Sequence, residues 1–110
     1  MKESVKKWLG EQMAGMDEEM IAGIYAEYGE TAVKLYKELC EKRAAGADFE
    51  TVDRVAHTLK GNALMVGDQA LFEAVQAWRA AIKEGGLAAG DPIWEPIGRE
   101  VAAIDGSAEA

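Results

Sequence analysis

Hydrophobic residues recur along most of this chain at spacings of three and four, which is the pattern of amphipathic α-helices. The longest stripe comprises Ile21, Ile24, Tyr28, Ala32, Leu35 and Leu39. No stretch alternates polar and apolar residues with a period of two, and no Asn-Gly, Asp-Gly or Gly-Gly dipeptide joins two such stretches. The pattern therefore predicts an all-α protein.

Capping residues and glycines divide this pattern into five expected helices. The first is short and covers about residues 4–14, with Val5, Trp8 and Leu9 at helical spacing. Each later helix is expected to start at an aspartate, and three of them to stop at a glycine. They run from Asp17 to Gly46, from Asp48 to Gly67, from Asp68 to Gly85-Gly86, and from Asp91-Pro92 to about Asp105.

Short connections between long helices favour antiparallel neighbours. We therefore expect an antiparallel up-down four-helix bundle over about residues 17–105, with a short additional N-terminal helix, in a single domain spanning residues 1–110. The N-terminal helix is expected to cover one end of the bundle. The alternative for this helix is an anchor on a membrane surface.

Composition removes several classes of function. The chain has 110 residues, a formal net charge of −8, one Cys and one His. A single Cys and a single His exclude a disulfide framework and a Cys/His zinc site, so no metal site is expected. The negative charge argues against nucleic-acid binding. The sequence shows neither a signal peptide nor an apolar run long enough to span a membrane, so we expect a cytoplasmic protein.

The single histidine, His57, lies about 160° around its helix from Leu59, the middle of the apolar stripe, and so points away from the core. Lys60 and Gly61 follow three and four residues later, on the same side. A glycine inside a helix costs ~1 kcal/mol relative to alanine, which suggests that something must approach the imidazole closely. The alternative is that His57 is an ordinary solvated histidine on the surface of the helix. The pattern favours an exposed histidine that accepts a phosphoryl group beside a lysine.

The segment from Ala56 to Ala63, AHTLKGNA, with Gly67 and Leu71 after it, resembles the histidine-containing phosphotransfer (HPt) domains of two-component phosphorelays. The resemblance implies that His57 takes a phosphoryl group from a receiver-domain aspartyl phosphate and passes it to another receiver aspartate. It also implies that Lys60 screens the phosphoryl charge and that Gly61 gives the receiver access. The chain would be a carrier rather than a turnover enzyme, and the Mg²⁺ would belong to the partner receiver.

One position departs from the family. Many HPt domains place Gln or Glu 22 residues after the histidine, and this chain has Arg79 there. Arg79 would strengthen the positive field around a phosphoryl group, or point elsewhere as a solvated side chain, with Gln76 one turn back as a substitute.

A receiver needs an apolar patch ringed by polar groups around His57. The expected docking residues are Leu64, Met65, Asp53 and Arg54. In a second interpretation, Leu64 is covered by the N-terminal helix. The expected partners are receiver domains of response regulators or of a hybrid histidine kinase, bound by a monomer.

Two other functions stay open on the sequence. The same fold serves as the phospho-accepting domain of chemotaxis-type histidine kinases, which would need a long continuation after residue 110. A helical module that binds a receiver or another partner without being phosphorylated is the second alternative.

Overall fold

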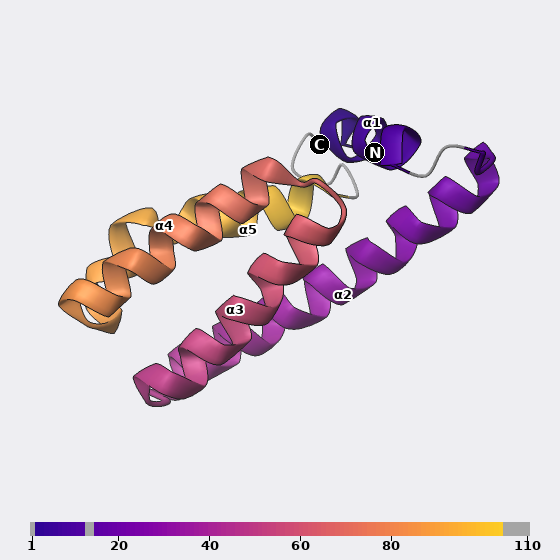
Figure 1. Ribbon diagram of the computed structural model, residues 1–110. Coiled ribbons are helices and arrows are strands. Elements are labelled where there is room, and N and C mark those ends of the chain that lie inside the picture. Colours follow the sequence, from indigo (N-terminus) through magenta and orange to yellow (C-terminus); the bar gives the residue numbers. More distant parts are fainter. Residues whose placement is uncertain (1, 13–14, 105–110) are drawn as a thin grey trace.

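Six helical segments follow one another in the part of the chain that the computed structural model describes, residues 2–12 and 15–104 (Figure 1). They are α1 (Glu3–Gln12), α2 (Glu18–Ala44), α3 (Phe49–Met65), α4 (Gln69–Gly85), a 3₁₀ segment η1 (Leu87–Ile93) and α5 (Glu95–Ala103). These residues contain no strand, so the all-α prediction is confirmed. The expected ends of the first and last helices, at residues 14 and 105, lie outside the described residues.

Helices α2, α3, α4 and α5 form an up-down bundle in which successive helices run in opposite directions (Figure 1). The long helix α2 packs against α3 and α5, α3 packs against α4, and α4 packs against both η1 and α5. The 3₁₀ segment η1 and the short helix α5 together take the place of the fourth long helix. The predicted antiparallel four-helix bundle is therefore confirmed, with its last member broken in two.

Aspartates begin three helices as predicted. The carboxylates of Asp17, Asp48 and Asp68 accept hydrogen bonds from the backbone N–H groups of Met20, Thr51 and Leu71, at 2.8, 3.0 and 3.3 Å. Each bond satisfies an amide that the first turn of a helix leaves without a partner.

The predicted start of the last helix, at Asp91-Pro92, is wrong. Pro92 lies inside η1, and α5 begins only at Glu95, with Pro96 at its start. The carboxylate of Asp91 forms an ion pair with Arg43 of α2 at 2.8 Å instead of capping a helix. Gly90 lies so close to the Trp78 ring that a Cβ would stand 2.3 Å from its Nε1 atom. Tertiary packing thus holds this segment in a tight 3₁₀ path.

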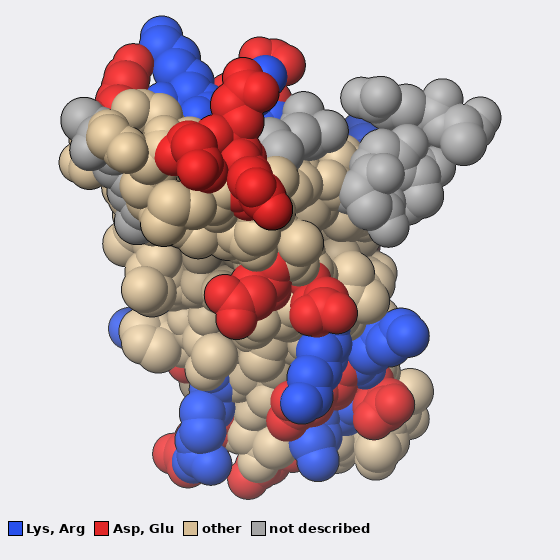
Figure 2. Space-filling view, turned by 90° about the vertical axis from the view of Figure 1, so that its right-hand side faces the viewer, with Lys and Arg blue, Asp and Glu red and all other residues tan. Residues whose placement is uncertain are grey.

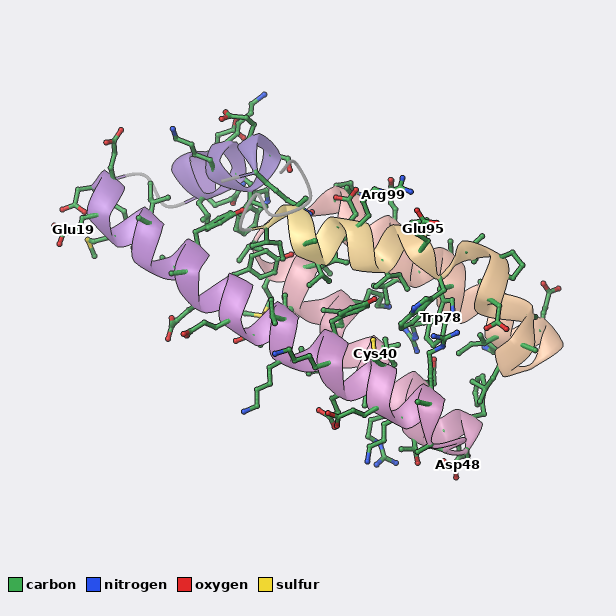
Figure 3. All side chains as sticks on the ribbon, turned by 180° about the vertical axis from the view of Figure 1, so that it is seen from behind. Glu19, Cys40, Asp48, Trp78, Glu95 and Arg99 are labelled. Carbon is green, nitrogen blue, oxygen red and sulfur yellow. The ribbon has the colours of Figure 1, made fainter. Side chains whose placement is uncertain are left out.

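The core is built from the predicted apolar stripes. Trp78 of α4 is fully buried, and its side chain points into the space between α2, α4 and α5, where Cys40 also lies (Figure 3). Trp94 packs against it at a centroid separation of 5.2 Å and stacks on Tyr36 at 5.6 Å. The apolar faces of α3 and α4 are buried at all predicted positions, namely Val52, Val55, Ala56, Leu59, Ala63, Val66, Leu71, Val75, Trp78 and Ile82.

Helix α1 covers the end of the bundle, as expected. Val5 and Leu9 are fully buried, and Trp8 lies against Gly67 in the turn between α3 and α4. Because its apolar face is used inside the molecule, α1 does not offer that face to a membrane. None of the helices in the described part of the chain is long and apolar enough to cross a bilayer.

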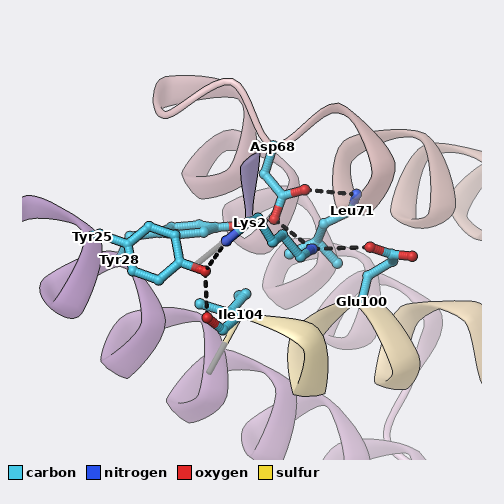
Figure 4. A network of polar contacts seen from close by, with 7 residues as sticks. All are labelled: Lys2, Tyr25, Tyr28, Asp68, Leu71, Glu100 and Ile104. Atoms are coloured by element: carbon cyan, nitrogen blue, oxygen red, sulfur yellow. Dashed lines mark hydrogen bonds and ion pairs between the residues drawn. The ribbon is translucent and has the colours of Figure 1, made fainter. Parts of the chain in front are cut away.

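A buried polar cluster joins the start of the chain to α2, to the start of α4 and to α5 (Figure 4). The Lys2 ammonium lies 2.8 Å from the Asp68 carboxylate and 3.0 Å from that of Glu100. The Tyr28 hydroxyl donates to Asp68 at 2.6 Å, and burial together with this carboxylate raises the pKa of Tyr28. The Tyr25 hydroxyl accepts from the Lys2 backbone N–H and donates to the Ile104 carbonyl. We call Lys2, Tyr28, Asp68 and Glu100 the buried cluster.

Charge is unevenly distributed over the surface. On the face shown in Figure 2, Asp and Glu predominate in the upper half, whereas Lys and Arg gather in the lower half among further carboxylates. This face carries no continuous basic surface of the kind that a nucleic acid requires.

Candidate functional site

His57 lies on the solvent side of α3. Its neighbours Val55, Ala56 and Leu59 are buried against the bundle, which turns the imidazole outward. The exposure predicted for His57 is therefore confirmed.

Arg79 of α4 is the residue that meets the imidazole. Its Nη1 atom lies 3.2 Å from Nδ1 of His57. The same guanidinium donates from Nε to one oxygen of Asp53 at 2.8 Å, and from Nη2 to the other at 3.1 Å. Asp53 precedes His57 by one helical turn, so the antiparallel packing of α3 on α4 brings the three side chains together. We call Asp53, His57 and Arg79 the histidine cluster.

Electrostatics keep the Asp53–Arg79 pair ionised. The hydrogen bonds from Arg79 hold the pKa of the Asp53 carboxyl below its usual range, and those to Asp53 raise the pKa of Arg79. A guanidinium has only donors. Its hydrogen bond to Nδ1 therefore assigns this nitrogen as the acceptor and places the proton of a neutral ring on Nε2.

Lys60 lies on the α4 side of the histidine. Its ammonium stands 5.9 Å from the centre of the Phe72 ring on α4. A shallow groove between the two helices is lined by Phe49, Asp53, Lys60, Gln76, Arg79, Ala80 and Lys83. Gln76 thus borders the site, but the described hydrogen bond to Nδ1 comes from Arg79. Three cationic side chains line one groove beside His57.

The surface beyond His57 is open. A Cβ added to Gly61 would meet no atom within 4 Å. Leu64, one further turn along α3, is 55% exposed, and Met65 is 76% exposed. The alternative in which α1 covers Leu64 is therefore wrong. Arg54 is exposed beside Asp53. The stripe of His57, Gly61 and Leu64 offers an apolar residue and an unobstructed backbone next to the imidazole.

The sequence pattern does not predict the ion pair between Asp53 and Arg79. It predicts Asp53 only as a docking residue, whereas in the structure both of its oxygens accept hydrogen bonds from Arg79. Its spacing of four residues before His57 is the signal that places it on the same face. Its partner, 26 residues away, depends on the packing register of two helices, which the pattern does not reveal.

Possible metal ligands were compared by their positions in the described part of the chain. The described residues contain no group of three or more His, Cys, Asp or Glu side chains placed to hold a metal ion.

Comparison with known proteins places the chain in a family. Searches of curated proteins and of solved structures return no significant match. The family model of the Hpt domain matches residues 9–107, nearly the whole chain. The chain therefore belongs to the Hpt domain family of two-component signalling.

Proposed function

We propose that this Hpt domain is a phosphorelay intermediate, in which His57 accepts a phosphoryl group from one receiver aspartate and passes it to another. Membership of the family implies a phosphotransfer role in two-component signalling. The observation that carries the finer proposal is the geometry around His57. Its Nδ1 edge is held by Arg79, and the helix beside it, at Gly61 and Leu64, is open to a partner.

The proposed transfer uses Nε2 of His57. Nε2 first gives up its proton, to water or to Nδ1, and its lone pair then attacks phosphorus while the P–O bond to the donor aspartate breaks, so that the aspartate keeps that electron pair as a carboxylate. The proton that the ring no longer holds passes to water. Donation to the second receiver is the reverse sequence with a new carboxylate as the attacking group.

Lys60 supplies positive charge in this proposal. Its ammonium now lies over Phe72, at the groove that Arg79 also lines. A lysine side chain has four rotatable bonds, so it can turn from the ring toward a phosphoryl group on the same helix. We propose that it stabilises the phosphoryl group after transfer.

Docking is assigned to the surface around the histidine. Leu64 and Met65 supply exposed apolar area, and the missing side chain of Gly61 lets a receiver loop approach the imidazole. Arg54 and Asp53 would border this contact and influence the choice of partner and the association rate.

We also propose that the chain acts in the cytoplasm as a monomeric carrier. In this scheme the receiver supplies the Mg²⁺ that neutralises its own acidic pocket during transfer. The Hpt chain would then hold the phosphoryl group without catalysing turnover.

Transfer from a labelled receiver tests the proposal. The chain is incubated with a receiver domain carrying ³²P on its aspartate, and we expect acid-labile, alkali-stable label on the wild-type chain and none on His57→Gln. Label on the H57Q variant would contradict the assignment of His57. Unlabelled wild-type chain that nevertheless binds the receiver as tightly as H57A would instead identify a binding module without phosphotransfer.

A further inference from the structure

Arg79 does more than add positive charge near His57. A Gln or Glu at this place would offer an oxygen that accepts a hydrogen bond from Nδ1–H, which leaves the lone pair on Nε2. Arg79 offers only a donor, so it selects the opposite tautomer, with the lone pair on Nδ1 and the proton on Nε2. The nitrogen that is open to a partner is thus the one that carries the proton.

We infer that Arg79 is a positioning residue that restrains phosphoryl transfer in both directions, until a docked receiver loosens its contact with Nδ1. The inference rests on the proposed role of His57 as the phosphoryl acceptor.

Uptake is restrained because Nε2 must first lose its proton. Attack on phosphorus needs the Nε2 lone pair, which the ring gains either by moving its proton to Nδ1 or by releasing it to water. Moving the proton to Nδ1 breaks the hydrogen bond from Arg79, because Nδ1 can no longer accept.

Release is restrained by the same contact. Once the N–P bond has formed, the neutral ring has a lone pair on Nδ1, which again accepts from Arg79. A ring that loses phosphorus leaves most easily when Nδ1 has first taken a proton from water, since a neutral imidazole then departs. The Arg79 hydrogen bond occupies that lone pair, so it stabilises the resting states before and after transfer and opposes the reactive state between them.

The surroundings of Arg79 support this role. Both oxygens of Asp53 accept from the guanidinium, and the two side chains are 27% and 22% exposed, so the orientation of Arg79 is well defined. Asp53 also neutralises the charge of Arg79, which reduces its value as a cation for phosphate. Lys60 and Lys83 line the same groove without a carboxylate partner among the described ion pairs, and Lys60 follows the histidine by one turn.

The tautomer is measured first, on the unphosphorylated full chain. Two-dimensional ¹H–¹⁵N NMR of the single imidazole distinguishes a protonated ring nitrogen from an unprotonated one. We expect wild-type His57 to carry its proton on Nε2, and Arg79→Gln, whose amide can accept as well as donate, to gain the Nδ1–H form. Arg79→Lys retains a donor and is expected to retain most of the wild-type tautomer. A wild-type ring with its proton on Nδ1 would overturn the inference.

The rate is measured with phosphoramidate, a small donor whose P–N bond breaks to release ammonia. No docking surface is involved, so the effect of Arg79 on the ring is isolated. We expect R79Q to take up phosphate about tenfold faster than wild type, because one hydrogen bond to a charged donor has been removed from the resting state. R79K should stay within about threefold of wild type.

The matched control is Arg99→Gln, which removes the same charge from an exposed arginine on α5, where the described contact of Arg99 is with Glu95 (Figure 3). Its uptake should equal that of wild type. Slower or unchanged uptake by R79Q would show that Arg79 assists the reaction or leaves it alone, and would refute the inference. If receivers fail to label His57 while both readouts behave as expected, it is the proposed relay function that fails.

Discussion

Two clusters of the same chemical type, each a carboxylate bound to a cation, lie at different places in this bundle. In the buried cluster, Asp68 is fully buried and accepts from Lys2, Tyr28 and the backbone of Leu71 (Figure 4). In the histidine cluster, Asp53 and Arg79 are partly exposed, and His57 is exposed beside them. The hydrogen bonds of the buried cluster are all made to groups within the protein. In the histidine cluster, the Nε2 atom of His57 remains available to a partner.

The two clusters are expected to serve different purposes, one for the stability of the fold and the other for the reactivity of His57. A buried carboxylate that loses its partners keeps its full desolvation cost, so breaking the buried cluster should cost more unfolding free energy than breaking the histidine cluster. A partly exposed pair can exchange its partners for water at little cost. We therefore expect substitutions in the first cluster to act on unfolding, and substitutions in the second to act on the reactivity of His57.

The largest effect is expected for Asp68→Ala. The change removes a helix cap and leaves the Lys2 ammonium and the Tyr28 hydroxyl without the carboxylate in a buried place, which should cost about 3–5 kcal/mol of unfolding free energy. Urea unfolding followed by circular dichroism measures it. Asp48→Ala is the matched control, because Asp48 caps α3 on the surface, and its loss of stability should be clearly smaller than that of D68A. Equal losses in the two variants would contradict the distinction between the clusters.

Lys2→Met is expected to rank second. Methionine retains much of the apolar stem but leaves Asp68 without its cation, while Tyr28 and the Leu71 backbone still donate to it. The expected loss is about 2–3 kcal/mol, measured by the same unfolding experiment. Lys6→Met is the control, since Lys6 is exposed on α1 and should change stability by less than about 0.5 kcal/mol. A K2M protein as stable as K6M would show that Lys2, just before α1, does not stabilise this end of the bundle.

Local signals in the sequence were sufficient for most of the fold. The caps at Asp17, Asp48 and Asp68 each bind an amide three residues later, so the sequence pattern contains all of the interaction. Asp91-Pro92 is an equally good local signal for a helix start, but the prediction that a helix begins there is wrong. There the close packing of Gly90 on the Trp78 ring, together with the ion pair between Asp91 and Arg43, 48 residues earlier, accompanies a 3₁₀ path in place of the predicted helix start.

The candidate site divides in the same way. The exposure of His57 follows from helical periodicity alone, and so does the position of Gly61 on its face. The paired hydrogen bonds between Asp53 and Arg79 depend on how α3 is aligned with α4. The ion pair between Lys2 and Asp68 joins residues that are 66 positions apart. Long-range pairs of this kind leave no periodic pattern, so they appear only once the helices are packed.

Gly61→Ala sharpens the comparison, because it should raise stability and lower function together. The backbone there is helical and a Cβ would meet open space, so alanine should stabilise the fold by about 0.5–1 kcal/mol. Transfer from a receiver should slow, since the added methyl lies on the face that the partner approaches. Gly23→Ala in α2 is the control: its Cβ also meets open space, so it should stabilise equally and leave transfer unchanged. Equal transfer by both variants would remove the access role of Gly61.

A small effect on stability is expected for Asp53→Asn, and its pH dependence identifies the cause. Asp53 has a pKa held below its usual value by Arg79, so its contribution is present above about pH 3.9, the ordinary value for Asp, and disappears as the pH falls through the lower folded value. Because both side chains are partly exposed, the difference between wild type and D53N at neutral pH should be no more than about 1 kcal/mol. Unfolding free energies measured between about pH 2.5 and 7 should therefore converge at the acid end. Asp48, whose pKa is also lowered, is present in both proteins, so its contribution cancels in the difference. A gap that persists at the lowest pH would mean that Asp53 acts through packing rather than through its charge, and would remove the electrostatic distinction between the two clusters.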